Sequence, residues 1–91
     1  MKIVINACYG GFHAPDHITK KYNHCKVDRT DADLVQWVEE NADEYGIAKC
    51  GRLSELMVVD IPNEATDYDI LEYDGMESVV CVIDGKLCWL E

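Results

Sequence analysis

The residue types best suited to binding chemistry lie near the amino terminus, in the segment Cys8-Tyr9-Gly10-Gly11-Phe12. A glycine-rich loop between a strand and a helix presents backbone N–H groups and the positive end of a helix dipole to an anion. Tyr9 and Phe12 could stack on a base or another ring, and Arg29 could make a bidentate contact with phosphate. The segment lacks the glycine spacing of the P-loop and of the dinucleotide-binding fingerprint. It therefore predicts either a site for an anionic ligand or a tight turn with two aromatic core residues.

The usual zinc ligands gather in the same part of the sequence, as His13, His17, His24, Cys25 and Cys8. Four such side chains could bind zinc tetrahedrally. Because His13 precedes Pro15, however, it lies outside the helix that this proline starts, and positions 24 and 25 point in different directions. Surface histidines on a short helix are the favoured interpretation, and we expect neither a metal nor another cofactor.

A catalytic thiol is the third chemical reading of this segment. Cys8 could act as a nucleophile with His13 or His17 as its base and Asp28 orienting that base. A small domain with no second layer to build a cleft argues against such an enzyme. We therefore expect no catalytic residue.

The charge of the chain is strongly acidic and unevenly distributed. Eighteen Asp and Glu residues outweigh eight Lys and Arg residues, for a net charge of −10. Residues 1–30 hold five of the cations and only two of the acids, so this third of the chain is basic. Direct binding to nucleic acid needs a basic footprint over the whole contact surface and is not expected. The acidic remainder could imitate nucleic acid or simply keep the protein soluble.

Length and composition favour one small cytoplasmic domain that covers residues 1–91. The apolar share of 48% is typical of a globular chain. The longest apolar runs are far shorter than the roughly 18–20 residues that span a bilayer, and the amino terminus enters a strand-like run without a basic leader. Five cysteines, an odd number without the paired spacing of a zinc ribbon, fit reduced thiols in the host bacterial cytoplasm.

The sequence pattern predicts an α+β fold in the order β-α-α-β, followed by an antiparallel meander. A buried strand is expected at 2–7, a helix from Pro15, a helix from Thr30 or Asp31 to Tyr45, and a strand at 56–61. The meander strands are 68–73, 77–83 and 86–90, joined at two Asp-Gly pairs that suit type I′ turns. We expect the first strand and strand 56–61 to be parallel neighbours, with two helices on one mixed sheet. Exposed meander edges make a homodimer or higher homo-oligomer reasonable.

Nearly the whole chain resembles a family of small, functionally uncharacterised proteins encoded in bacteriophages and prophages. Its opening, Met1 to Asn6 followed after one residue by Cys8 to Phe12, is similar to the opening of that family. The other matching stretches follow in the same order: Arg29 to Asp31 leading into Leu34, Val35, Val38 and Glu39, then Val58 to Pro62, then Glu72 to Glu77. The resemblance implies a phage origin and no particular reaction.

The resemblance also selects among the candidate residues. The matching polar, glycine and aromatic positions are Cys8–Phe12, Arg29–Asp31 and Tyr73–Gly75, from three separate segments that each lie at the end of an expected element. A shared pocket at one edge of the sheet would explain these matches. The family usually has residues other than histidine at positions 13 and 17, so these two histidines are particular to this chain. The family also tends to have a His-Arg pair before a tryptophan near its end, where this chain has Asp84-Gly85-Lys86 before Trp89.

The leading functional hypothesis is a phage-encoded, non-enzymatic protein that counters a host defence system by sequestering an anionic small molecule, such as a signalling nucleotide. In this hypothesis Tyr9 or Phe12 stacks on a base, with Tyr73 nearby. The amides of Gly10 and Gly11 and the Arg29 side chain hold phosphate, and Asp31 or Asp74 binds a ribose hydroxyl.

The alternative belongs to another class of protein, an inhibitor that imitates nucleic acid and occupies a basic groove on a host defence protein. The acids of the second helix, which are Glu39, Glu40, Asp43 and Glu44, would carry that function together with acids of the meander.

Overall fold

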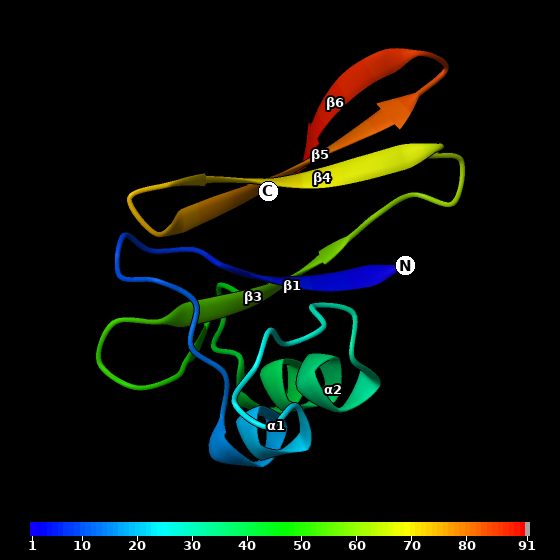
Figure 1. The fold of residues 1–91 in the computed structure, drawn as a ribbon. Coiled ribbons are helices and arrows are strands. Elements are labelled where there is room, and N and C mark those ends of the chain that lie inside the picture. The colour runs from blue at the N-terminus through cyan, green and yellow to red at the C-terminus, as the bar shows by residue number, and fades with distance from the viewer. Residues whose placement is uncertain (91) are drawn as a thin grey trace.

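Two helices and two small sheets form three stacked layers in the computed structural model, which describes residues 1–90 (Figure 1). Sheet A has the strand order β1-β3-β2 and lies between the helices and sheet B, whose order is β4-β5-β6. The elements are β1 (Lys2–Asn6), α1 (Asp16–Lys21), α2 (Ala32–Asn41), β2 (Ala48–Lys49), β3 (Glu55–Asp60), β4 (Asp67–Tyr73), β5 (Met76–Ile83) and β6 (Lys86–Leu90). The predicted α+β class is confirmed.

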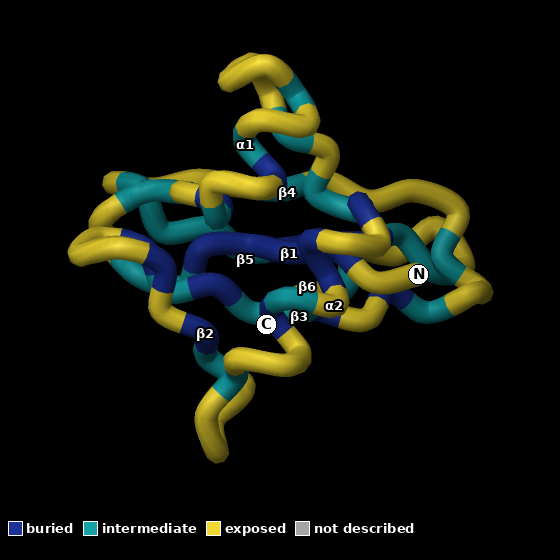
Figure 2. The backbone as a smooth tube through the Cα atoms, turned by 90° about the horizontal axis from the view of Figure 1, so that it is seen from below, coloured by how far each residue is buried: buried dark blue, intermediate teal, exposed yellow. Residues whose placement is uncertain are grey.

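Strand β1 is buried on both faces, which explains its uninterrupted apolar run. Val4 packs with Leu34 and Leu56 in the core between sheet A and the helices. Ile3 and Ile5 point the other way and pack with Val79 of sheet B. Figure 2 shows β1 as a buried segment that runs through the middle of the molecule. The two cores therefore meet at this strand.

The expected parallel pairing and the single mixed sheet are both wrong. Strand β1 pairs with β3 in the antiparallel direction, with Lys2 opposite Asp60 and Asn6 opposite Leu56. A continuous apolar run is typical of a strand covered on both faces, and such strands are most common in parallel sheets. Here the second cover is sheet B and not a second layer of helices. Sheet B is therefore an additional layer, which we did not expect in so small a domain.

Helix α2 begins as predicted and ends earlier than predicted. The Asp31 side chain caps it by accepting hydrogen bonds from the backbone N–H groups of Asp33 and Leu34. The helix stops at Asn41, because the following residues form a turn in which the Asp43 carboxylate accepts from Tyr45 N and Ile47 N. Tyr45 is consequently 78% exposed and is not part of the apolar stripe.

The carboxyl-terminal meander is confirmed, including both turns. Asp74 and Gly75 have φ values of 51° and 87°, and Asp84 and Gly85 have values of 52° and 75°. Two successive positive φ angles are the signature of the type I′ hairpin turn.

Among residues 1–90, no helix is long and apolar enough to cross a membrane.

Asp31 makes two side-chain contacts besides the cap. One carboxylate oxygen accepts from Lys21 Nζ at 2.7 Å and from the Tyr22 hydroxyl at 2.6 Å. These hydrogen bonds, that from Lys21 first, hold the pKa of Asp31 well below its ordinary value. A depressed pKa means that the charged form stabilises the fold above the unfolded-state pKa, and that this contribution is lost as the pH falls through the folded-state pKa.

We predict that Asp31→Ala lowers the free energy of unfolding by about 1–2 kcal/mol at neutral pH through loss of the cap. Asp31→Asn keeps a capping oxygen and loses the charge, so its stability should fall less steeply than that of the wild type below about pH 5. Urea unfolding monitored between neutral and acidic pH measures both effects. Equal acid sensitivity of the wild type and Asp31→Asn would contradict the assignment.

Candidate functional site

Three of the sequence segments expected to share a site do meet in the structure. The Arg29 guanidinium lies over the Phe12 ring, 3.5 Å from its centre. A Cβ atom built on Gly75 would lie 2.9 Å from Gly11 N, so the β4–β5 turn rests directly on the glycine pair. Tyr9, Tyr73 and Asp74 flank this contact in sequence, and all three are exposed. Asp31 belongs elsewhere, at the start of α2.

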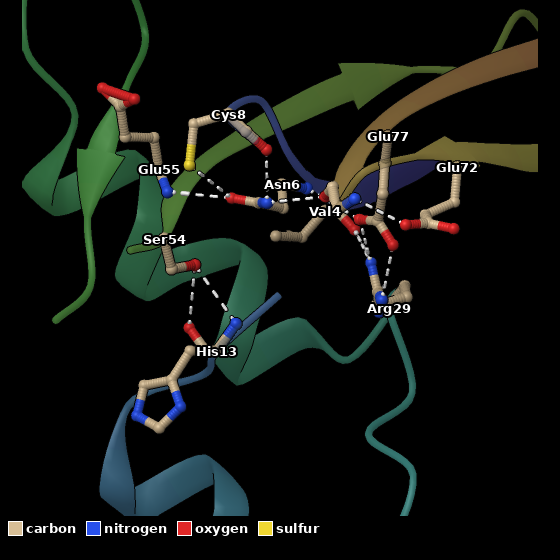
Figure 3. A network of polar contacts seen from close by, with 10 residues as sticks. Val4, Asn6, Cys8, His13, Arg29, Ser54, Glu55, Glu72 and Glu77 are labelled. Carbon is tan, nitrogen blue, oxygen red and sulfur yellow. Dashed lines mark hydrogen bonds and ion pairs between the residues drawn. The ribbon is translucent and has the colours of Figure 1, made fainter. Parts of the chain in front are cut away.

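The buried Asn6 side chain connects these segments (Figure 3). Its Nδ2 donates to the backbone oxygens of Cys8 and Gly75, both at 2.8 Å. Its Oδ1 accepts from Glu55 N at 2.9 Å and from the Cys8 thiol. One amide therefore joins the glycine loop, the β4–β5 turn and the start of β3. Sequence reasoning did not select Asn6, since a lone asparagine after a strand carries no recognisable pattern.

Arg29 is occupied by an internal ion pair. Its two terminal nitrogens donate to the two carboxylate oxygens of Glu77 at 2.6 and 2.8 Å. The side chain of Glu77 is only 8% exposed, and it also accepts from Asn6 N. The phosphate contact that we expected from Arg29 would have to displace this nearly buried carboxylate. The structure thus assigns Arg29 to packing between the sheets.

Gly10 is explained by close packing, whereas Gly11 has open space at its Cβ position and a φ of 137°. A Cβ atom on Gly10 would lie 1.8 Å from the carbonyl oxygen of Leu53, which is far inside contact distance. The loop at 50–54 is held against the glycine loop by the buried Ser54, whose hydroxyl accepts from His13 N and donates to His13 O. Close packing therefore explains Gly10, but Tyr9 is 65% exposed and is not the aromatic core residue that the tight-turn interpretation expected.

Two adjoining hollows share Phe12 and His13 in their walls. The first, with a volume of about 410 Å³, lies between the glycine loop and the segment Cys50–Leu53. The second, of about 320 Å³, lies between Phe12–Ala14 and the segment that runs from Cys25 to Arg29. Both are preformed, because the Ser54–His13 contacts and the Arg29–Phe12 stack fix their shared wall.

The cations of these hollows have no acidic neighbours in the walls. Arg52 lines the first hollow, and Lys26 and Arg29 line the second. No carboxylate side chain among residues 1–90 lines either one, although hollows elsewhere include Asp28, Asp67 or Glu77. Within that part of the chain Lys26 and Arg52 form no ion pair. The two hollows are therefore a locally basic region of an acidic protein.

Cys50 forms part of the first wall as an unreactive thiol. Burial raises its pKa, and the nearby Asp16 carboxylate adds to this effect. All five cysteines are unpaired, and the described residues contain no cluster of three or more His, Cys, Asp or Glu side chains suited to a metal. The arrangement can bind through charge, backbone groups and the Phe12 ring.

Arg52, like Asn6, is a residue that sequence reasoning missed. It lies forty positions after Phe12 in sequence, in a segment that was assigned no element. The available signal was Gly51, which adopts a φ of 72° and marks a tight loop. Nothing in the sequence indicated which other loop this turn would face.

Comparison of the chain with models of protein families, with curated proteins and with solved structures finds no match. The geometry of the molecule itself must therefore carry any argument about function.

We predict that Arg29→Met lowers the free energy of unfolding by about 3 kcal/mol, because it leaves the Glu77 carboxylate buried without its counter-ion. Adding Glu77→Gln to that variant should restore part of the loss, since the amide is neutral and can still accept from Asn6 N. Denaturant unfolding of the wild type, both single variants and the double variant gives the coupling free energy. Additive losses would show that the pair contributes nothing.

Gly10→Ala should cost about 3 kcal/mol, because its Cβ would overlap the Leu53 backbone. Gly46→Ala is the matched control. Its φ of 79° is strained for alanine, but no atom lies within 4 Å of the new Cβ, so we expect a loss of about 1 kcal/mol. Thermal unfolding compares the two variants, and a Gly10→Ala protein as stable as the control would refute the close contact.

Proposed function

We propose that this protein is a non-enzymatic binding protein that captures an anionic small molecule in the two hollows around Phe12 and His13. The observation that carries the proposal is the absence of carboxylates from these walls, among residues 1–90, in a chain with eighteen acids. Unbalanced cations beside a preformed hollow attract an anion, and electrostatic repulsion from the acidic remainder makes this region the favoured place of contact.

The ligand class that suits these walls is a phosphate attached to a ring. Arg52 can bind phosphate through a bidentate, charge-assisted contact, and Lys26 supplies a point charge. The Phe12 ring offers an apolar surface for a base or sugar. A signalling nucleotide has both parts. In this version Arg52 takes the role that the sequence had suggested for Arg29, and Asp31 takes no part.

The biological setting that we propose, a bacteriophage protein acting in a host cell, rests on the sequence pattern alone. A phage protein that removes a signalling nucleotide from a host cell would block a defence response that depends on that signal. The defence role depends on this setting and on the ligand class together, so it stands only if a nucleotide binds.

Isothermal titration calorimetry against cyclic nucleotides, linear nucleotides and inorganic pyrophosphate tests the proposal. We expect at least one nucleotide to bind the wild type. Arg52→Ala should weaken that binding by about 10–100-fold, as expected for loss of a charge-assisted hydrogen bond. Lys86→Ala is the control, because it also removes one cation but lies in the β5–β6 hairpin, outside both hollows.

Two results would contradict the proposal. One is no heat of binding across the panel with folded protein. The other is an equal loss of affinity in Arg52→Ala and Lys86→Ala, since that would indicate only a general effect of net charge.

Mimicry of nucleic acid by the acidic surface is the second candidate. The exposure of Glu39, Glu40 and Glu44 on and after α2 favours it. Against it, Glu39 pairs with Lys2 at 2.6 Å, and Asp43 is used in the turn after α2. Charge reversal at Glu40 and Glu44 should abolish inhibition by a mimic and leave nucleotide binding intact, whereas Arg52→Ala should do the opposite.

A further inference from the structure

Two of the three long edge strands have blocked edges. The outward backbone groups of Val4 in β1 are bound by Arg29, through its carbonyl oxygen at 2.9 Å and its guanidinium at 3.3 Å. The outward N–H groups of Tyr68 and Ile70 in β4 donate to the carboxylates of Asp67 and Asp69. Such contacts prevent another strand from pairing. The remaining long edge strand is β6.

The free edge of β6 presents the backbone of Leu87 and Trp89. In a two-residue hairpin the residues that flank the turn, here Ile83 and Lys86, are hydrogen-bonded to each other. Because the direction alternates along an antiparallel strand, Lys86, Cys88 and Leu90 face β5, while Leu87 and Trp89 face outward. Outside the β5–β6 ladder, no hydrogen bond among residues 1–90 uses the backbone of Leu87 or Trp89.

The side chains of this edge are apolar and largely unprotected. Leu87 is 71% exposed and Trp89 is 69% exposed. The core between the sheets includes Cys88 and Leu90 and neither of these two side chains, although Trp89 also lines a hollow with Ile5 and Met57 of sheet A. Lys86 is the only charged residue between 86 and 90, whereas β4 has three acids. In a chain of net charge −10, this strand is therefore where a second, equally acidic molecule meets the least repulsion.

We propose that two copies of the chain pair through β6, antiparallel about a two-fold axis at Cys88, to give one continuous six-stranded sheet. In this register Leu87 of each copy forms a hydrogen-bonded pair with Trp89 of the other, which uses all four free backbone groups on each side. The same register places Leu87 and Trp89 side by side on the outer face. They continue the row formed by their partners in β5, Val82 and Val80.

The register has a chemical consequence at Cys88. The two Cys88 residues would form a non-hydrogen-bonded pair, with Cα atoms about 4.5 Å apart, which is within the range that a disulfide can bridge. Copper(II) phenanthroline should therefore oxidise the two thiols to a disulfide between copies, with loss of two protons and transfer of two electrons to copper(II). Cys25 is more exposed than Cys88 and is the internal control for random collision.

Sedimentation equilibrium of the full chain tests the pairing. We expect a monomer–dimer equilibrium that tightens as salt is added, because salt screens the repulsion between two acidic molecules. Leu87→Pro removes an outward N–H and leaves the β5–β6 ladder intact, so it should abolish the dimer. Leu87→Ala keeps the N–H and should still dimerise, within about tenfold of the wild type. Circular dichroism checks that both variants are folded.

Peptide mapping after oxidation gives a readout that needs no edge variant. A Cys88–Cys88 peptide in the covalent dimer, lost in Cys88→Ser while the non-covalent dimer persists, supports the register. A monomer at every concentration and salt, cross-linking mainly through Cys25, or a dimer unaffected by folded Leu87→Pro would each overturn the proposal. Binding of an extended peptide by a monomer at this edge would also overturn it.

Discussion

The arrangement of the two sheets depends on the ion pair between Arg29 and Glu77. Glu77 is a nearly buried carboxylate on β5, and it receives hydrogen bonds from Asn6 in β1 as well as from the arginine. Arg29 in turn binds both backbone groups of Val4 and covers the Phe12 ring. A buried charge without its partner is costly, so the loop before α2, the edge of β1 and sheet B must come together as a unit.

The same contacts involve the sequence stretches on which the expected family resemblance was based. Asn6, Gly10, Arg29, Gly75 and Glu77 lie in matching stretches, and each is used in an internal contact. These stretches thus have a structural role within this chain. Arg52 and Lys26, the two cations of the proposed site that form no ion pair among residues 1–90, both lie outside these stretches.

The sequence predicted local elements well and contacts between distant elements poorly. The Asp-Gly turns, a helix cap at Thr30 or Asp31 and the strand at Leu56 were evident because their signals lie within a few residues. The antiparallel direction of β1 relative to β3 was not evident, because an apolar run such as Ile3–Ile5 indicates only that the strand is buried on both faces. The part of the first hollow formed by Cys50–Leu53 was missed for a related reason. Arg52 is brought close to Phe12 because Gly10 packs against Leu53, and no periodic sequence pattern indicates a contact between two loops.

The central position of β1 has a consequence for how the chain folds. Of the strands described here β1 is synthesised first, but its ladder partner β3 ends at Asp60, 58 residues after Lys2, and the Glu77 carboxylate that binds Asn6 N is later still. The β4–β5–β6 hairpins close over a few residues and can form rapidly, whereas β1 must wait for long loops to close. A growing polypeptide therefore exposes this strand, four of whose five residues are buried in the folded protein, until β5 has also left the ribosome, and aggregation is a hazard during that interval.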